Sequence, residues 1–167
     1  MDLFFHNTID LKNPAFVFSD EESRHLSKVL RKQPGDLVAV TDGKGLEVHI
    51  QIQNISSRKT NGHMVETIVH PAPKHQTHIA IAPTKNNVRL EWFLEKATEI
   101  GIHRITPLLC QHSERKVIKH DRLTKILQAA LKQSQQFHLP QLDELISFET
   151  FVAQQKKGYI AHCNTGE

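Results

Sequence analysis

Basic side chains gather in two places along the chain, at spacings that suit a polyanionic partner. Residues 24–32 hold four Lys or Arg and no acid, and residues 112–125 hold five Lys or Arg against two acids. Each cluster fits a nucleic acid, because Lys and Arg neutralise phosphates. A solvated helix face is the simpler interpretation, and it stays open for both clusters. The bases are Arg24, Lys28, Arg31 and Lys32, then Arg115, Lys116, Lys119, Arg122 and Lys125.

The first cluster predicts a basic row on one face of a helix. Arg24, Lys28 and Arg31 stand at i, i+4 and i+7, and His25 lies beside them. Basic residues on a helix usually contact phosphates and carry no base specificity of their own. The row therefore predicts that these four side chains position the phosphates of a nucleic acid, with an affinity that falls steeply with salt.

The element that carries this row is expected to be a helix over residues 20–32. Ser19 and Glu22 fit a capping box at its start, and Pro34 with Gly35 stops it. Its buried face would consist of three apolar residues at helical spacing: Leu26, Val29 and Leu30.

The remainder of residues 1–70 predicts β-structure. Strands are expected over residues 15–18, 37–41, 46–52 and 64–70. In the third of these, apolar and polar residues alternate with the period of two of a half-buried strand. The sequence Asp42-Gly43-Lys44-Gly45 supplies the turn before it. A small antiparallel barrel or sandwich is the expected result.

The pattern of expected secondary structure changes after residues 71–76. This segment contains two prolines, which predict a linker. Residues 77–167 alternate strands with helices, the pattern of an α/β fold with a parallel sheet. The expected strands cover residues 77–83, 104–110 and 158–163, and the expected helices cover about 87–100, 121–138 and 147–156.

Both longer helices of this half are predicted to be amphipathic. In the first, Asn87 caps the start, Gly101 ends the helix, and the buried face holds Leu90, Phe93, Leu94, Ala97 and Ile100. Its outer face carries a row of three acids, Glu91, Glu95 and Glu99. In the second helix Ser134 lies on the apolar face, where its hydroxyl either bonds back to the helix or faces a pocket.

Other site chemistry has little support. The histidines and cysteines worth testing as metal ligands do not match a standard zinc spacing, so no metal is expected: His75 with His78, and Cys110 and His112 with His162 and Cys163. Two distant cysteines do not form a disulfide framework. The chain lacks a Walker loop and a GxGxxG motif, so nucleotide hydrolysis and ordinary dinucleotide binding are unsupported.

Two blocks of residues, one in each half, form a more specific pattern. The first runs through residues 22–31 and continues at 34–36 and 42–45. The second comprises Lys85, residues 89–92, 95–101, Pro107, 113–115, and Gln133-Ser134 before Pro140. Both blocks have the order and spacing of the RsmE family of 16S rRNA methyltransferases, which the chain resembles over nearly its whole length.

The resemblance implies a PUA-like β-barrel that binds RNA over residues 1–70. It further implies that residues 77–167 are the first part of a SPOUT α/β methyltransferase domain, whose C-terminal part ties a trefoil knot around S-adenosylmethionine. Family members work as dimers. Their Gly-Pro-Glu-Gly loop would come after Glu167, so the cofactor-binding residues are expected there. The 167-residue chain is accordingly expected to be C-terminally truncated and inactive by itself.

The implied reaction is methylation of N3 of a uridine in 16S rRNA, free or in the small ribosomal subunit. The uridine must lose its N3 proton, and an arginine suits the resulting anion. Arg115 follows an expected strand, where ligands of open α/β sheets lie, and is the leading catalytic candidate. A phosphate-contacting or surface arginine is the alternative.

The resemblance marks further candidates in the second half. Lys96 and Glu99 are catalytic candidates, although a simple ion pair on the helix would explain them equally well. Lys116 is expected to contact RNA. Arg89, Gln133 and Ser134 are expected to shape the pocket.

Composition narrows the class of protein further. The formal net charge is +3 and the sequence pI is about 8.9, a mild basic excess. No apolar run approaches the length of a membrane span, and Asp2 gives the N-terminus the wrong polarity for a secretory signal. We therefore expect a cytoplasmic protein. The rival to a methyltransferase is a non-catalytic RNA-binding module whose α/β half serves as a docking surface.

Overall fold

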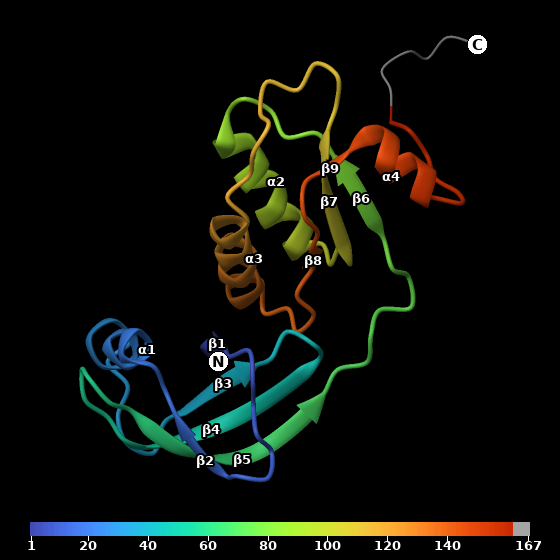
Figure 1. Ribbon diagram of the computed structural model, residues 1–167. Coiled ribbons are helices and arrows are strands. Elements are labelled where there is room, and N and C mark those ends of the chain that lie inside the picture. Colours follow the sequence, from blue (N-terminus) through green and yellow to red (C-terminus); the bar gives the residue numbers. More distant parts are fainter. Residues whose placement is uncertain (162–167) are drawn as a thin grey trace.

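The computed structural model describes residues 1–161, which form two lobes, each with its own β-sheet. We call residues 1–70 the N-lobe and residues 77–161 the C-lobe. An extended segment connects them, leaving strand β5 (Asn61–Val69) and entering strand β6 (His78–Ile81), as Figure 1 shows. In the described part of the chain, every helix is too short or too polar to cross a bilayer.

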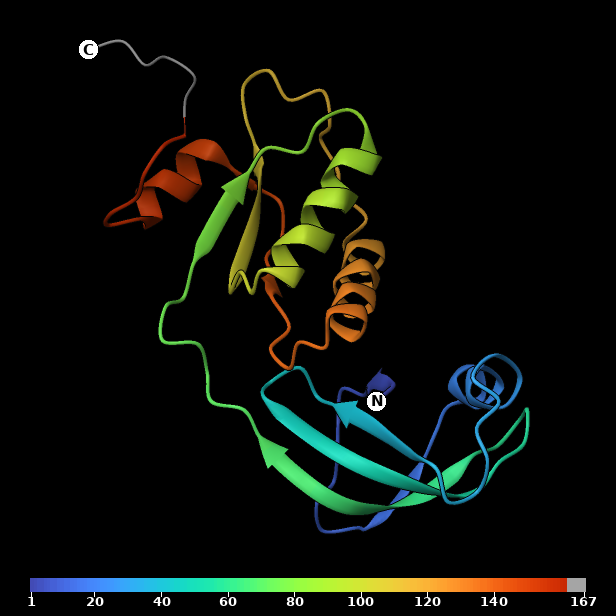
Figure 2. The same ribbon diagram turned by 180° about the vertical axis from the view of Figure 1, so that it is seen from behind.

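The N-lobe is built on a five-stranded sheet that curves into half of a barrel (Figures 1 and 2). The strand order is β1-β3-β4-β5-β2, antiparallel throughout except for the parallel pair β1 and β3. The first four strands are β1 (Leu3–Phe5), β2 (Ala15–Val17), β3 (Leu37–Thr41) and β4 (Leu46–Asn54). The four strands expected from the sequence are confirmed, whereas β1 was not predicted. The sheet ends at β1 on one side and β2 on the other, so it does not close into a full barrel.

Alternation along β4 builds the core of this lobe, as the sequence predicted. Val48, Ile50 and Ile52 point inward and are at most 1% exposed. They pack with Phe16, Phe18 and other buried side chains in one cluster. Burial of each such aliphatic side chain contributes about 1.5–3 kcal/mol, which fixes the register of the strand.

The predicted helix over residues 20–32 forms differently. Ser19 and Glu22 make the expected capping box at α1 (Asp20–Arg24), but the chain then widens into a π-helix, η1 (His25–Val29). The wider turn rotates Val29 to the surface, where it is 64% exposed, so its place in the predicted apolar stripe was wrong. Arg31 lies beyond the helix with φ 52°, so the predicted helix end and the i, i+7 row were also wrong.

The C-lobe has the parallel α/β pattern predicted from the sequence. Strand β7 (Arg104–Leu109) pairs in parallel with β6, β8 (Gln141–Leu142) and β9 (Ile146–Ser147). Helices α2 (Asn87–Glu99) and α3 (His120–Ser134) cover one face of the sheet (Figure 1). The short helix α4 (Phe148–Gln154) lies on the other side, where Phe151 meets His78 edge-on.

Several helix details differ from the prediction. Asn86, not Asn87, caps α2, because its side chain accepts the Val88 N–H at 2.9 Å. Ile100 is 74% exposed, since the helix has already ended at that position. Helix α3 stops at Ser134 and not near residue 138, because Gln135 turns into the left-handed region at φ 54°.

The end of the chain also departs from expectation. Residues 158–161 of the predicted strand 158–163 do not form a strand, and Tyr159 and Ile160 are exposed. His162 and Cys163 lie outside the described residues. The two-residue strands β8 and β9 were not predicted.

The loop of residues 42–45, between β3 and β4, joins the two lobes, and we call it the docking loop. The Leu139 N–H donates to the Gly43 carbonyl at 2.8 Å, and the Gly45 N–H donates to the Phe137 carbonyl at 2.8 Å. Lys44 and His138 form an antiparallel bridge between these bonds. The turn predicted from the sequence thus also makes a backbone contact to the C-lobe.

Glycine is required at two positions of the docking loop. Gly43 and Gly45 have φ values of 71° and 98°, which disfavour other residues. A Cβ at Gly43 would lie 2.9 Å from the Leu139 Cβ, and a Cβ at Gly45 would lie 2.7 Å from the His138 Cε1 as well as 2.6 Å from the His70 carbonyl oxygen. The lobes approach this closely because no side chain stands between their backbones.

Apolar and aromatic contacts surround the docking loop. Leu3, Ala39 and Leu131 form a small buried cluster between the lobes. The His70 ring stacks on Phe137 with centroids 3.9 Å apart and planes 2° from parallel. Glu47 orients that ring through a 2.7 Å contact with His70 Nε2. Burial alone would raise the pKa of Glu47, but hydrogen bonds from His70 and His49 outweigh it and lower that pKa.

Gly45→Ala should destabilise the protein more than Gly35→Ala. Both residues have nearly equal φ, 98° and 96°, but a Cβ at Gly35 meets nothing within 4 Å. Gly35→Ala should cost about 1–2 kcal/mol of backbone strain, and Gly45→Ala about 3 kcal/mol or more because the loop must also move. Urea unfolding followed by circular dichroism measures both. Equal losses would contradict the close packing of the docking loop.

Candidate functional site

Arg115 lies at the carboxyl edge of the C-lobe sheet, as the sequence predicted. It belongs to the loop after β7, seen at the top of Figure 1. Its Nε donates to the Thr84 carbonyl at 3.2 Å, and its Nη2 donates to the Lys85 carbonyl at 2.5 Å. Arg115 therefore ties the loop after β7 to the loop after β6.

Other basic residues lie on the same edge. Lys85 is exposed and 3.8 Å from Glu114, Arg89 is exposed in the first turn of α2, and Lys116 is exposed beside Arg115. Arg115 and these three residues lie in the loops after β6 and β7 or in the first turn of α2. All four therefore follow the carboxyl ends of parallel strands. This edge is where ligands of open α/β sheets bind.

Lys96 and Glu99 lie at the opposite end of the C-lobe from Arg115. Both are in the last turn of α2, which runs back from the carboxyl edge over about 20 Å. Lys96 Nζ bonds both carboxylate oxygens of Glu99 at 2.8 Å. Gln136 donates to the Glu99 carbonyl at 3.2 Å. The three catalytic candidates therefore do not form one cluster.

Gln133 and Ser134 also lie at that opposite end, in the last turn of α3. The Ser134 hydroxyl donates to the Ala130 carbonyl at 2.7 Å, the back-bond to its own helix that the sequence left open. Gln133 is exposed and faces the N-lobe across a cleft. The structure thus separates these pocket candidates from Arg89.

Glu91 differs from the acidic row predicted for α2. Its side chain is only 18% exposed and lies 2.8 Å from the Arg122 guanidinium of α3. Glu91 thus faces the neighbouring helix, whereas Glu95 is exposed.

An open cleft of about 1100 Å³ separates the N-lobe helix from α3, and we call it the inter-lobe cleft. Arg24 and His25 line it from the N-lobe, together with residues 1–8. Lys125 and Lys132 of α3 line the other side. Lys28 and Arg31 are exposed on the N-lobe but are not among the lining residues. The sequence had marked Lys125 as part of a basic cluster and Gln133 as a pocket residue, but it had not marked Lys132 or joined these residues into one wall.

A polar network crosses the sheet at the start of β6 and β7, and it was not predicted from the sequence. The carboxylate of Asp143 accepts Arg104 Nε at 2.7 Å, Gln141 Nε2 at 2.9 Å, and the Thr106 hydroxyl. His78 Nε2 lies 2.7 Å from the Thr106 oxygen. Because the single Thr106 proton goes to Asp143, His78 must be the donor in that bond.

This network shifts two pKa values. Burial alone would raise the pKa of Asp143, but hydrogen bonds from Arg104 and Thr106 outweigh it and hold that pKa below its ordinary 3.8. Burial lowers the pKa of His78 from its ordinary 6.5, and the positive charge of Arg104 lowers it further. A neutral His78 and an ionised Asp143 fit the bonding pattern.

Metal ligation has no support in the described residues. Within residues 1–161, three or more His, Cys, Asp or Glu side chains do not converge at any point as a metal-binding group. His78 is engaged with Thr106 instead of approaching His75 as a ligand pair. The second arrangement tested from the sequence includes His162 and Cys163, which lie outside the described residues.

Both lobes match RNA methyltransferase families. A family model described as an RNA methyltransferase domain matches residues 70–167, and one described as an RNA methyltransferase PUA domain matches residues 18–60. The first match alone covers more than half of the chain.

Two relatives carry the name ribosomal RNA small subunit methyltransferase E. The protein of Bacillus subtilis (strain 168) is 29% identical over 143 residues, which cover 81% of this chain and 56% of that protein. The protein of Rickettsia conorii is 25% identical over 134 residues, which cover 80% of this chain and 54% of that protein. The chain thus spans about half the length of the curated relatives it matches.

Solved structures share the fold of both lobes. A probable rRNA-methyltransferase from Porphyromonas gingivalis superposes with a TM-score of 0.84 at 33% identity, covering 93% of this chain and 64% of that one. A ribosomal RNA small subunit methyltransferase E from Neisseria gonorrhoeae, bound to S-adenosyl methionine, superposes with a TM-score of 0.83 at 18% identity. That alignment covers 93% of this chain and 65% of the other.

Asp143→Asn should destabilise the chain by about 1–3 kcal/mol at neutral pH, because the amide replaces a half-buried charged acceptor. A lowered folded-state pKa means that the carboxylate stabilises the fold fully above about pH 3.8 and loses this effect as the pH falls through the folded value. The difference between the two proteins should therefore shrink below about pH 3.8. Urea unfolding at several pH values measures it.

Glu144→Gln is the matched control, since its side chain is 84% exposed and the charge change is the same. It should change stability by less than about 0.5 kcal/mol. A difference between Asp143→Asn and the unsubstituted chain that stays constant into acid would show that the network does not depend on the ionised carboxyl.

Proposed function

Because this chain belongs to the RsmE family of RNA methyltransferases, we propose that the protein containing it methylates N3 of a uridine in 16S rRNA, with S-adenosylmethionine as donor. The observation that carries this proposal is the match of both lobes, in one chain, to a methyltransferase domain and to its companion PUA domain. The proposed substrate is 16S rRNA, free or in the small ribosomal subunit. The site of action is the cytoplasm.

The proposed architecture extends beyond the described residues. The N-lobe serves as the PUA-like RNA-binding part, and the C-lobe is the first part of a SPOUT domain. In this proposal the trefoil knot, the cofactor-binding residues and the dimer contacts lie outside residues 1–161. S-adenosylmethionine supplies the methyl group when it is bound there.

The carboxyl edge of the C-lobe suits the RNA better than the cofactor. Its exposed side chains include Lys85, Arg89 and Lys116, and a row of cations repels a positively charged sulfonium. The same cations attract phosphates and an anionic base. We therefore assign none of residues 1–161 to cofactor binding and assign this edge to the substrate.

Arg115 is the proposed catalytic residue of this edge. Methylation at N3 requires the base to lose its N3 proton and to carry negative charge on O2 and O4. A guanidinium has five N–H groups, and the carbonyls of residues 84 and 85 accept from only two of its nitrogens. These two bonds fix the orientation of Arg115, so its remaining donors are preorganised for the anion.

Lys96 and Glu99 have a different role in this proposal. They neutralise each other at the far end of α2, so neither reaches a base bound beside Arg115. Their pairing supports the end of α2. At that end Gln136, which precedes the residues bonded to the docking loop, donates to the Glu99 carbonyl. Gln133 and Ser134 likewise belong to the lobe-facing end of the C-lobe.

Deletion of the gene tests the proposed reaction directly. Nucleosides from digested 16S rRNA of the deletion strain should lack N3-methyluridine in mass spectrometry, and a plasmid copy of the gene should restore it. Unchanged N3-methyluridine in the deletion strain would overturn the proposal. If the gene product still bound 16S rRNA, the rival function as a non-catalytic RNA-binding module would replace it.

Arg115→Ala in the plasmid copy should reduce the rate of methylation about 10²–10³-fold, the usual effect of removing a donor to a developing anion. Arg122→Ala is the matched control, because the Arg122 guanidinium is already paired with the Glu91 carboxylate of α2 at 2.8 Å. It should leave the rate within about twofold, since exposed ion pairs contribute little. Circular dichroism must show that both variants are folded. Full activity of Arg115→Ala would remove Arg115 from the chemistry.

A further inference from the structure

The second wall of the inter-lobe cleft joins Lys125 and Gln133, which the sequence marked separately, with residues that it did not mark. Lys125, Gln128, Lys132 and Gln133 stand at i, i+3, i+7 and i+8 of α3, so they share one face of the helix. The opposite face is buried against the C-lobe core through Leu123 and Leu127. Figure 1 shows α3 on the side of the C-lobe next to the N-lobe, and the residues that line the cleft place the polar face of α3 opposite the N-lobe helix.

The α3 wall offers hydrogen-bond donors and two positive charges, and its cleft-lining residues include no acid. Lys125 and Lys132 are separated by about 10 Å along the helix axis, so each can meet a different phosphate. Gln128 and Gln133 add amide groups that both donate and accept. Across the cleft, Arg24 and His25 present a planar cation and an aromatic ring, the two side-chain types on which bases stack.

The acids of the cleft lie on the N-lobe side, and two of the three have partners. Asp2 pairs with Lys32 at 2.9 Å, and the Glu22 carboxylate bonds the Ser19 backbone and hydroxyl in the capping box. Glu21 is the third, in the first turn of α1. Positive charge therefore dominates on the α3 side, and a polyanion should lie closer to α3.

The lining favours a nucleic acid over a protein partner. Protein interfaces are depleted in lysine and enriched in aromatic and apolar anchors at their centres. Here the centre of the α3 wall carries lysines and glutamines. Double-stranded RNA hides its base edges, whereas a single strand exposes them to the amides and to stacking groups.

We propose that a single strand of RNA binds in the inter-lobe cleft and contacts both lobes, with Lys125 and Lys132 of α3 bound to its phosphates. This inference rests on the proposed function, and it extends RNA binding from the N-lobe to a defined face of the C-lobe. The docking loop then sets the width of the RNA site, because it holds the two walls in their relative positions.

The test is the binding of a fluorescein-labelled single-stranded RNA of about 12 nucleotides, a length that single-strand sites cover. Fluorescence anisotropy compares the 167-residue chain with its Lys125→Gln/Lys132→Gln variant. The variant should bind about tenfold more weakly. Its plot of log affinity against log salt should be less steep by about 1.4, the loss expected for two single-strand phosphate contacts.

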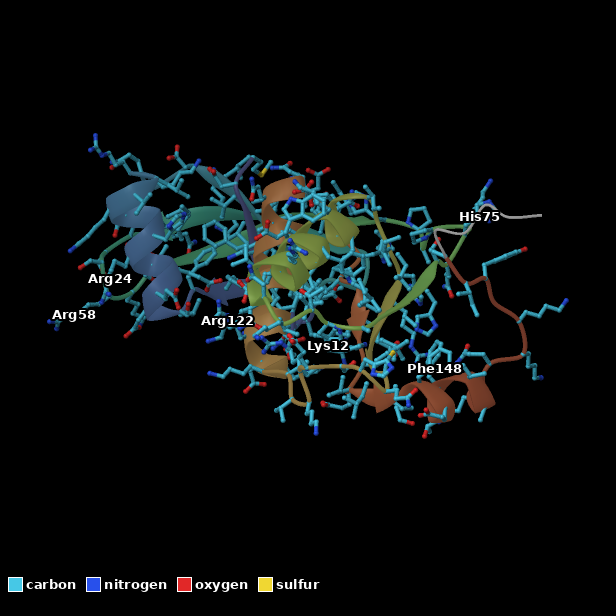
Figure 3. All side chains as sticks on the ribbon, turned by 90° about the horizontal axis from the view of Figure 1, so that it is seen from above. Lys12, Arg24, Arg58, His75, Arg122 and Phe148 are labelled. Atoms are coloured by element: carbon cyan, nitrogen blue, oxygen red, sulfur yellow. The ribbon has the colours of Figure 1, made fainter. Side chains whose placement is uncertain are left out.

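Lys156→Gln/Lys157→Gln is the control, with the same loss of charge outside the cleft. Figure 3 shows Arg24 and α4, which begins at Phe148, at opposite ends of the molecule, and these two lysines follow α4. The control should bind RNA as the unsubstituted chain does. If both double variants bound the RNA equally weakly, the loss of net charge would explain the effect, and the proposal would be overturned.

Other outcomes separate this inference from the proposed function. Unchanged binding by Lys125→Gln/Lys132→Gln would overturn the cleft as the RNA site, and so would failure of the unsubstituted chain to bind the RNA. In both cases the loss of N3-methyluridine in the deletion strain would still stand for the proposed reaction. Circular dichroism of the variants excludes unfolding as the cause of weaker binding, since both lysines lie on the polar face of α3.

Discussion

The backbone contact between the docking loop and residues 137–139 is the constraint on which the rest of the structure depends. Two 2.8 Å hydrogen bonds and two glycines bring the lobes together without an intervening side chain. The His70–Phe137 stack and the cluster of Leu3, Ala39 and Leu131 then exclude water around these bonds. Because such bonds are directional, they fix an orientation that apolar contacts alone would leave adjustable. The inter-lobe cleft exists only in that orientation.

Local patterns predicted the parts of the fold that depend on one element at a time. The alternation in β4, the capping box of Ser19 and Glu22, and the apolar face of α2 each reflect a single periodicity or a single turn of helix. What the sequence did not predict depends on distant residues. Strand β1 is defined by its pairing with β3, and the two-residue strands β8 and β9 exist only because β7 lies beside them. Likewise, nothing local marks the change from α1 to the π-helix that exposes Val29.

The candidate site shows the same division. Arg115 could be placed at the carboxyl edge from its position after a strand. In a parallel sheet every loop that follows a strand lies at that edge, whatever the order of the strands. Resemblance grouped Lys96 and Glu99 with Arg115, but a helix that runs away from the edge separates them in space. The α3 wall was missed because Lys125 and Lys132 become a site only when the N-lobe stands opposite them. Asp143 escaped notice for a similar reason, since its partners Arg104 and Thr106 come from strand β7, far away in the sequence.

Strand β1 also bears on how the chain reaches its native state. Its apolar residues are synthesised before their partners, because Leu3 is buried against Ala39 of β3 and Leu131 of α3, both later in the chain. Contacts of such long sequence separation slow folding, because the intervening chain must be ordered before they form. During synthesis this strand therefore stays without its full complement of neighbours until α3 has emerged. An apolar strand in that condition is a natural substrate for chaperones that bind nascent chains.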